Sequence, residues 1–78
     1  MQIEITTPDK TVFEGSCSLA QIPGVDGLFE ILENHAPMIA LLGSGKMKLK
    51  DESDQYHYFD INGGVLEVKE NFVKVLAE

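Results

Sequence analysis

Hydrophobic side chains recur at every second position in short runs of this chain, and this pattern constrains its fold most. The alternating runs are residues 2–6, 46–50, 56–61, 66–69 and 72–76. Successive side chains of a β-strand point to opposite faces, so these runs are typical of strands with one buried face. The best helical candidate, residues 29–42, is interrupted by Pro37 and followed by Gly43. The sequence therefore predicts an all-β chain.

Turn-forming residues separate the alternating runs at short intervals. The separators are residues 7–10, 14–15, 23–27, 43–45, 51–54, 62–64 and 70–71. Turns spaced about 8 to 12 residues apart are typical of sandwiches and barrels, so we expect about eight to ten short strands in a sandwich or barrel. The length of 78 residues, without linker or repeat, predicts one domain over residues 1–78. Residues 51–55 are the most polar and are expected to form a hairpin tip.

Composition excludes several classes of function. The net charge is -7, from 13 acidic and 6 basic residues, so we expect no binding to nucleic acid or to an anionic lipid surface unaided. The longest apolar run, residues 36–42, is far shorter than the roughly 20 residues that cross a bilayer. No secretory signal is visible at the N-terminus. Cys17 is the only cysteine, so it forms no disulfide within the chain and is expected to be buried in a protein of a reducing compartment.

No residue pattern in the sequence points to catalysis, a metal or a cofactor. The histidines, His35 and His57, lack the spacing of a zinc site. Residues 43–46 begin like a phosphate loop, but Met47 stands where Ser or Thr is required and a strand follows. A Ser, His and Asp set assembled only by folding is invisible in a sequence, so a small hydrolase remains an alternative.

Three lysines occupy alternate positions of one expected strand. Lys46, Lys48 and Lys50 form its outer face, where lysines discourage pairing between sheet edges. Binding to single-stranded nucleic acid needs aromatic residues among such positions. Met47 and Leu49 stand there instead, so nucleic-acid binding is rejected and the lysines are interpreted as the polar half of an amphipathic strand.

The segment 21–42 is apolar, although it contains many turn residues. Its larger hydrophobic residues are Val25, Leu28, Phe29, Ile31, Leu32 and Met38. Grouped apolar residues on loops mark interaction surfaces, so we expect part of this segment to contact a partner protein. Two alternative roles are weighed equally for His35: it donates a hydrogen bond to a loop carbonyl, or it contacts that partner.

Two blocks of residues resemble a known family. They are Ile22-Pro23-Gly24-x-x-Gly27 followed by Ile31-Leu32-x-x-His35-Ala36-Pro37-Met38, and Phe59-x-x-x-Gly63-Gly64-x-Leu66-Glu67-Val68-x-x-Asn71-x-Val73-x-Val75-Leu76-Ala77. Together with Pro8, Val12, Phe13 and Gly15, they resemble the N-terminal domain of the epsilon subunit of F-type ATP synthases. The resemblance extends over essentially the whole chain.

The resemblance implies a ten-stranded β-sandwich in a non-catalytic subunit of the rotor's central stalk. Such a domain binds the gamma subunit and the ring of c subunits, and it couples ion-driven rotation in a proton-translocating enzyme to ATP synthesis. The implied c-ring residues are Thr7, in a turn, and a loop formed by Asp26, Gly27, Leu28, Phe29, Glu30 and Ile31. The implied gamma residues are His35, Ala36, Pro37 and Met38, with one sheet face beside them. Its place is peripheral, at the cytoplasmic face of a bacterial inner membrane, or at the matrix or stromal side in an organelle.

The chain departs from the family pattern at three places. Glu30 stands where the family usually has Gly, and Glu33-Asn34 stands where it has Pro-Gly. Asn tolerates positive φ better than most residues, so Asn34 is the milder change. The chain ends at Glu78, without the C-terminal helical hairpin that in the family binds ATP and inhibits hydrolysis. We expect neither property in this polypeptide, whether the hairpin is naturally absent or truncated.

A free-standing β-sandwich that binds a sugar or a peptide is a further alternative. Modules of this kind display aromatic platforms. The chain has no Trp and only Tyr56 and Tyr58 near a turn.

Overall fold

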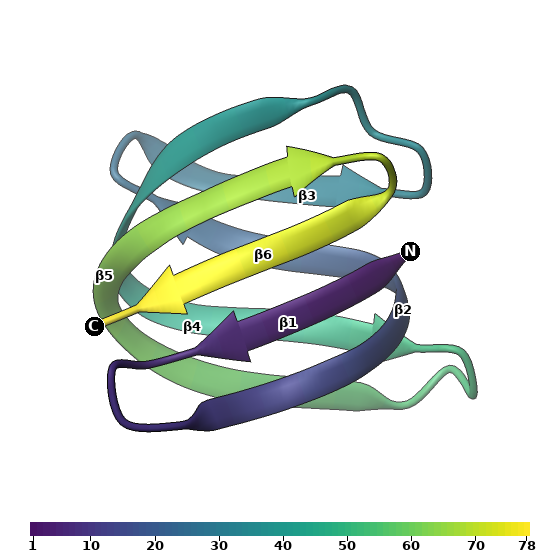
Figure 1. Cartoon of the computed structure of the whole chain (residues 1–78), viewed down its shortest axis with the longest axis horizontal. Helices are drawn as coiled ribbons and strands as arrows, with labels where there is room; N and C mark the ends of the chain where they lie inside the picture. Colours follow the sequence, from purple (N-terminus) through teal and green to yellow (C-terminus); the bar gives the residue numbers. More distant parts are fainter.

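The structure, a computed structural model that describes residues 1–78, contains six β-strands and no helix (Figure 1). The strands are β1 (Gln2–Thr6), β2 (Thr11–Gly24), β3 (Gly27–Leu32), β4 (Met38–Asp51), β5 (Tyr56–Lys69) and β6 (Phe72–Ala77). The all-β prediction is confirmed. No helix is present that has the length and apolar character needed to cross a membrane.

Five of the six strands close into a barrel. The strand order is β1-β6-β5-β4-β2-β3, and an additional pairing between β1 and β2 closes the ring. The β1–β6 pair is parallel and every other pair is antiparallel, so the sheet is mixed. β2 pairs with β1 through its first half and with both β3 and β4 through its second half. β3 is thus an extra strand, paired with β2 alone.

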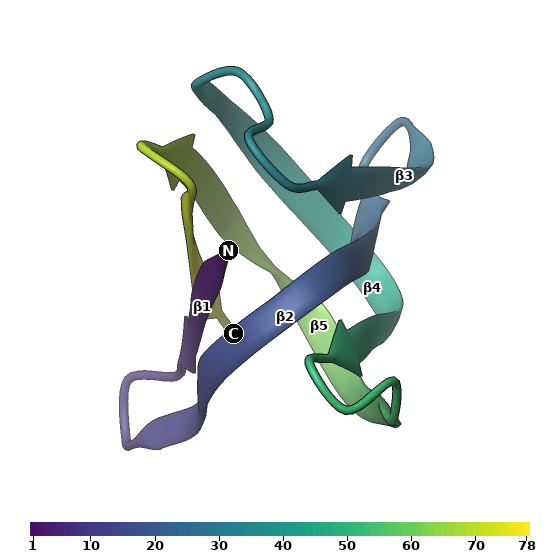
Figure 2. The same cartoon turned by 90° about the vertical axis from the view of Figure 1, so that its right-hand side faces the viewer.

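The prediction of about eight to ten strands is wrong, because three strands are much longer than expected. β2, β4 and β5 each contain 14 residues and bend around the barrel (Figure 2). The expected turns at 14–15, 43–45 and 62–64 lie inside these strands and bend them without ending them. Glycine within a strand often marks such a bend.

The clearest bend is in β5, at Gly63 and Gly64. Both residues have positive φ, 134° and 143°, a region in which other residues are strained. A Cβ added to Gly64 would lie 2.1 Å from the carbonyl oxygen of Leu76 on β6. Only glycine therefore permits this close approach of β5 and β6.

The alternating residues face a single apolar core, as predicted. Its buried members are Met1, Ile3, Ile5, Cys17, Ala20, Ile22, Ile31, Leu42, Met47, Leu49, Ile61, Leu66, Val68, Val73, Val75 and Ala77. The burial expected for Cys17 is confirmed, and it raises the pKa of the thiol to about 11. The thiol is therefore protonated at neutral pH and a poor nucleophile.

The expected hairpin tip at residues 51–55 is confirmed. The Oδ1 atom of Asp51 accepts hydrogen bonds from the backbone N–H groups of Ser53 (2.8 Å) and Gln55 (3.0 Å). Its Oδ2 atom accepts one from Nε2 of His57 at 2.7 Å. The His57 ring lies against Phe13 of β2, with the ring centroids 5.3 Å apart. One carboxylate thus fixes the tip and orients the histidine.

Candidate interaction surfaces

One outer face of the barrel is apolar although it points to solvent. It is formed by Ile39 and Leu41 on β4, Val65 on β5 and Leu76 on β6, which we call the apolar face. Leu41 pairs with Val65, and Val65 pairs with Leu76, so three neighbouring strands contribute to one row. The side chains are 72%, 63%, 38% and 53% exposed, respectively. A connected apolar patch of this kind is typical of an interaction surface.

The β2–β3 hairpin extends the apolar face at one side. The backbone N–H of Val25 donates a hydrogen bond to the Leu41 carbonyl at 3.1 Å, which holds the hairpin tip against β4. Val25 and Leu28 are both exposed. A hollow between this hairpin and the first half of β4 is lined by Val25, Leu28, Phe29, Met38, Ile39 and Leu41, with neighbouring backbone. Two of these lining residues, Phe29 and Met38, also pack against the buried core.

The residues implied at a c-ring do not form a loop. Asp26 lies in the β2–β3 turn, but residues 27–31 belong to strand β3, which corrects the expectation of a loop. Gly27, Leu28 and Glu30 are exposed on this strand, and Phe29 is half-buried. Ile31 is fully buried in the core.

Thr7 lies apart from β3, in the turn that joins β1 to β2. Its hydroxyl accepts hydrogen bonds from the backbone N–H groups of Asp9 and Lys10, both at 3.3 Å. Both turns lie on the left side of Figure 1, but Figure 2 shows them at separate corners of that end. The structure therefore brings together Asp26 and the exposed part of β3, with Thr7 at the same end of the barrel.

The residues implied at a gamma subunit lie beside the apolar face. His35, Ala36 and Pro37 are exposed in the connection between β3 and β4, and the half-buried Met38 begins β4. The Nδ1–H of His35 donates to the Ala36 carbonyl at 2.8 Å, so the hydrogen-bonding role weighed for this ring is present. Its ring remains exposed, which leaves the contact role open to test.

A cluster at the N-terminus fixes the start of this connection. The ammonium group of Met1 donates hydrogen bonds to the Glu33 carboxylate and to the Cys17 carbonyl. Asn71 donates to Glu33 through Nδ2 at 3.1 Å and accepts from the Asn34 backbone N–H at 2.8 Å. We call Met1, Glu33, Asn34 and Asn71 the N-terminal clasp. The hydrogen bond from the ammonium group, with a second from Asn71, holds the pKa of Glu33 below its ordinary value.

The clasp explains one departure from the family pattern. Asn34 has a φ of 61°, as its tolerance of positive φ led us to expect. Glu33, where the family usually has Pro, is an acceptor for two donors of the clasp. The two residues therefore belong together in this chain.

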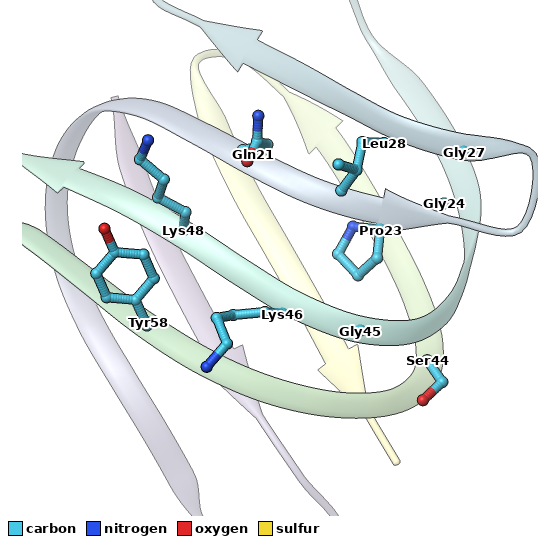
Figure 3. Close-up of a pocket in the computed structure, with 10 residues that line it drawn as sticks. All are labelled: Gln21, Pro23, Gly24, Gly27, Leu28, Ser44, Gly45, Lys46, Lys48 and Tyr58. Atoms are coloured by element: carbon cyan, nitrogen blue, oxygen red, sulfur yellow. The ribbon is translucent and has the colours of Figure 1, made fainter.

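The three lysines form a second surface on the outer side of an amphipathic strand, as predicted, but the added role of discouraging edge pairing is wrong. At these positions β4 is an interior strand: Lys48 pairs with Gln21 of β2 on one side and with Tyr58 of β5 on the other. Figure 3 shows Lys46, Lys48 and Tyr58 around a hollow next to this pairing. The sheet has no free edge here for lysines to protect.

Sequence reasoning missed the four residues of the apolar face. The alternation itself carries a signal: Leu66 and Val75 are inward members of the runs 66–69 and 72–76, so their neighbours Val65 and Leu76 point outward. Ile39 and Leu41 lie in a run that is apolar on both faces, which conceals the outward positions. No group of three His, Cys, Asp or Glu side chains is placed to hold a metal ion.

These features define a class, a small mixed β-barrel with an exposed apolar face beside a structured loop. Residues 1–78 match the family model for the β-sandwich domain of the ATP synthase delta/epsilon chain. The chain therefore belongs to the ATP synthase epsilon chain family, whose members are non-catalytic subunits, and the resemblance is confirmed. This assignment replaces the hydrolase and the free-standing binding module as explanations of the chain.

Two curated relatives illustrate the range of lengths in the family. The chain is 40% identical over 77 residues to the ATP synthase epsilon chain of Chlorobium limicola, covering 99% of this chain and 88% of the relative. It is 39% identical over 87 residues to that of Salinibacter ruber, covering all of this chain but only 58% of the relative. The chain thus spans most of one relative and little more than half of the other.

Solved structures support the fold. A chain in the Euglena gracilis mitochondrial ATP synthase (OSCP/F1/c-ring) superposes with a TM-score of 0.90 at 18% identity, covering 96% of this chain and 48% of that one. A chain of the Tetrahymena thermophila mitochondrial ATP synthase central stalk and c-ring superposes with a TM-score of 0.82 at 17% identity, covering 99% and 62%. At these identities, the comparison concerns the fold alone.

Proposed function

We propose that the chain is a central-stalk subunit of a proton-translocating F-type ATP synthase, and that it binds the gamma subunit and the c-ring. In this role it couples ion-driven rotation to ATP synthesis without an active site of its own. The observation that carries the proposal is the apolar face, which is unpartnered in the free chain. The solved structures similar to this chain come from a complex with a c-ring and from a central stalk.

The gamma subunit is assigned to the apolar face and to His35, Ala36, Pro37 and Met38. The two parts are continuous, because Pro37, Met38 and Ile39 line one hollow over β5. Apolar burial contributes about 25 cal/mol per Å², so covering this face supplies much of the binding free energy. The N-terminal clasp holds the connection from its far side, which presents these residues in one conformation.

The c-ring is assigned to the end of the barrel that carries Asp26 and β3. Asp26, Gly27, Leu28 and Glu30 offer the exposed part of this contact, Phe29 is half-accessible, and Thr7 adds the neighbouring turn. Ile31 supports the strand from the core. Glu30 places an exposed carboxylate where relatives usually have a bare backbone, so this contact is expected to differ most from those of its relatives.

The proposed location follows from the proposed assembly. A domain that contacts the foot of the rotor lies at the membrane without entering it. That place is the cytoplasmic face of a bacterial inner membrane, or the matrix or stromal side of an organelle.

The test is co-expression of the chain with its cognate gamma subunit, followed by co-purification. Leu41→Glu places a charge on the apolar face and is expected to weaken the recovery of gamma at least about tenfold, since a buried unpaired charge costs several kcal/mol. Val12→Glu is the matched control, because Val12 is an exposed apolar residue of β2 that is not a member of this face. Equal recovery of gamma with both variants would remove the gamma assignment.

The c-ring assignment has its own test. Leu28→Glu is expected to lower ATP-driven proton pumping relative to ATP hydrolysis in the reconstituted enzyme. Because Leu28 also lines the hollow beside Ile39 and Leu41, the recovery of gamma is measured with the same variant. Unchanged coupling with Leu28→Glu would show that β3 does not contact the ring.

A further inference from the structure

The second surface of the barrel is a row of lysines with tyrosines beside it. Lys46, Lys48 and Lys50 lie on the outer side of β4, directly opposite Asp60, Tyr58 and Tyr56 of β5. We call these three lysines the lysine row. It holds three of the six basic residues of a chain whose net charge is -7. The row is therefore an island of positive charge on an acidic molecule.

The middle lysine of the row has no carboxylate partner. Lys46 lies 3.5 Å from Asp60 and Lys50 lies 3.6 Å from Asp54, while no carboxylate lies within ion-pair distance of Lys48. The ammonium group of Lys48 lies over the Tyr56 ring, 4.6 Å from its centroid. The carboxylates of Asp60 and Asp54 are 83% and 82% exposed, so their pairs are weak and exchange readily for other anions.

A hollow next to Lys48 gathers further donors. It is lined by Gln21, Ser44 and Tyr58, with Pro23 and Leu28 as its apolar part. In Figure 3 the amide of Gln21, the ammonium of Lys48 and the hydroxyl of Tyr58 extend from three neighbouring strands. Bare backbone at Gly24, Gly27 and Gly45 also lines the hollow, which permits a close approach by another chain.

We infer that the lysine row is a docking surface for an extended acidic segment of a partner protein. Alternate residues of an extended strand are about 6.8 Å apart, so glutamates or aspartates at every second position match the spacing of Lys46, Lys48 and Lys50. The central carboxylate meets Lys48, with donors from Gln21 and Tyr58 beside it. The two outer carboxylates of the segment replace Asp60 and Asp54 as the partners of Lys46 and Lys50.

An extended protein segment fits the charge distribution better than other anions do. A bilayer or a nucleic acid presents a wide anionic surface, which the net charge of -7 repels. A single small anion engages only one unpaired lysine. A short acidic segment engages the whole row while leaving the acidic remainder of the chain in solvent. The inference does not depend on the proposed stalk function, because none of the three lysines is assigned to gamma or to the c-ring, although Gly27 and Leu28 line both the hollow and the proposed c-ring contact.

The experiment uses the 78-residue chain and a synthetic acetylated pentapeptide of alternating glutamate and serine. Backbone amide shifts in NMR spectra report where and how tightly the peptide binds at low ionic strength. We expect shifts centred on Gln21, Lys48 and Tyr58, with a dissociation constant on the order of millimolar that rises with salt. A peptide of alternating glutamine and serine is expected to give no shifts.

Two variants with the same change in net charge distinguish binding at the lysine row from attraction by the overall charge of the chain. Lys48→Gln is expected to weaken the acidic peptide about tenfold, whereas Lys10→Gln, in the β1–β2 turn, is expected to change its affinity less than about twofold. Circular dichroism confirms that both variants are folded. Equal weakening by both variants, shifts centred elsewhere or no shifts at millimolar peptide would overturn the inference. Tighter binding of inorganic phosphate, or of phosphatidylglycerol vesicles, than of the peptide would also overturn it.

Discussion

The two halves of β4 bury similar side chains but expose different ones. Along both halves the inward residues are apolar, with Leu42 buried in the first half and Met47 in the second. The outward residues of the first half are Ile39 and Leu41, whereas those of the second half are lysines. The comparison teaches that core packing fixes the strand and leaves its outer side free to specify a partner.

Glycines separate the two halves. β4 and β5 bend together, because Leu42 pairs with Gly64 and Ser44 pairs with Asn62. The bend lets one pair of strands present an apolar face at one end and the lysine row at the other. Changes at the bend should therefore affect both surfaces, and changes on either surface should leave the other intact.

The largest expected effect is that of Gly64→Ala. Its Cβ would lie 2.1 Å from the Leu76 carbonyl oxygen at a φ of 143°, so β6 must move away. We expect a loss of about 4 kcal/mol or more in the free energy of unfolding, measured by urea denaturation. Gly43→Ala is the matched control on β4, because its Cβ would meet nothing closer than 3.5 Å. Similar losses for both variants would contradict the account of the bend.

The next effect contrasts two adjacent leucines. Leu42 is 4% exposed and Leu41 is 63% exposed. Leu42→Ala is expected to cost about 2 to 4 kcal/mol of stability, because it leaves a cavity in the core. Leu41→Ala is expected to change stability by less than about 0.5 kcal/mol, while it weakens gamma binding. Thermal unfolding measures the first contrast, and a large loss of stability for Leu41→Ala would mean that the apolar face serves the fold and not a partner.

A smaller effect concerns the clasp beside the apolar face. The lowered pKa of Glu33 means that its ionised form is favoured by folding. Its contribution to stability is complete above the ordinary glutamate pKa and is lost as the pH falls through the lower folded value. Glu33→Gln should therefore flatten the pH dependence of the melting temperature in this acidic range. A profile identical to that of the unmodified chain would show that the clasp contributes nothing to stability.

The smallest effect is expected at the hairpin tip beyond the lysine row. The pKa of Asp51 is lowered mainly by the hydrogen bond from His57, and further by those from the backbone N–H groups of Gln55 and Ser53. By the same linkage, Asp51 stabilises the fold above the ordinary aspartate pKa and loses this effect as the pH falls through its folded value. Asp51→Asn should remove that acid sensitivity, which a pH series of urea midpoints measures. If the variant loses stability in acid as the unmodified chain does, other carboxylates cause that loss.

The sequence predicted the inward side of the fold well. The alternation correctly assigned Ile3, Ile5, Met47 and Leu49 to the core, because a one-residue error in register would expose the whole set. It failed on the number of strands, because the same glycines that end a strand can also bend one. Residues 62–64 read as a turn, and only the pairing of β5 with both β4 and β6 shows that the strand continues.

The outward side was harder to predict. The segment 36–42 is apolar at nearly every position, so alternation does not show that Leu41 points to solvent. The lysines were identified correctly as an outer face, but their neighbours were not. The aromatic residues beside them come from β5, and only the register of Lys48 with Tyr58 brings them together.

One measurement tests most directly the claim that the apolar face docks to gamma. Cys17 is fully buried and its pKa is raised to about 11, so it gives little background reaction with maleimide. A Leu41→Cys variant is expected to react readily in the free chain. In the complex with gamma, the account predicts that its reaction slows at least about tenfold, as a contact that excludes solvent requires. Equal rates in the free chain and in the complex would contradict the account.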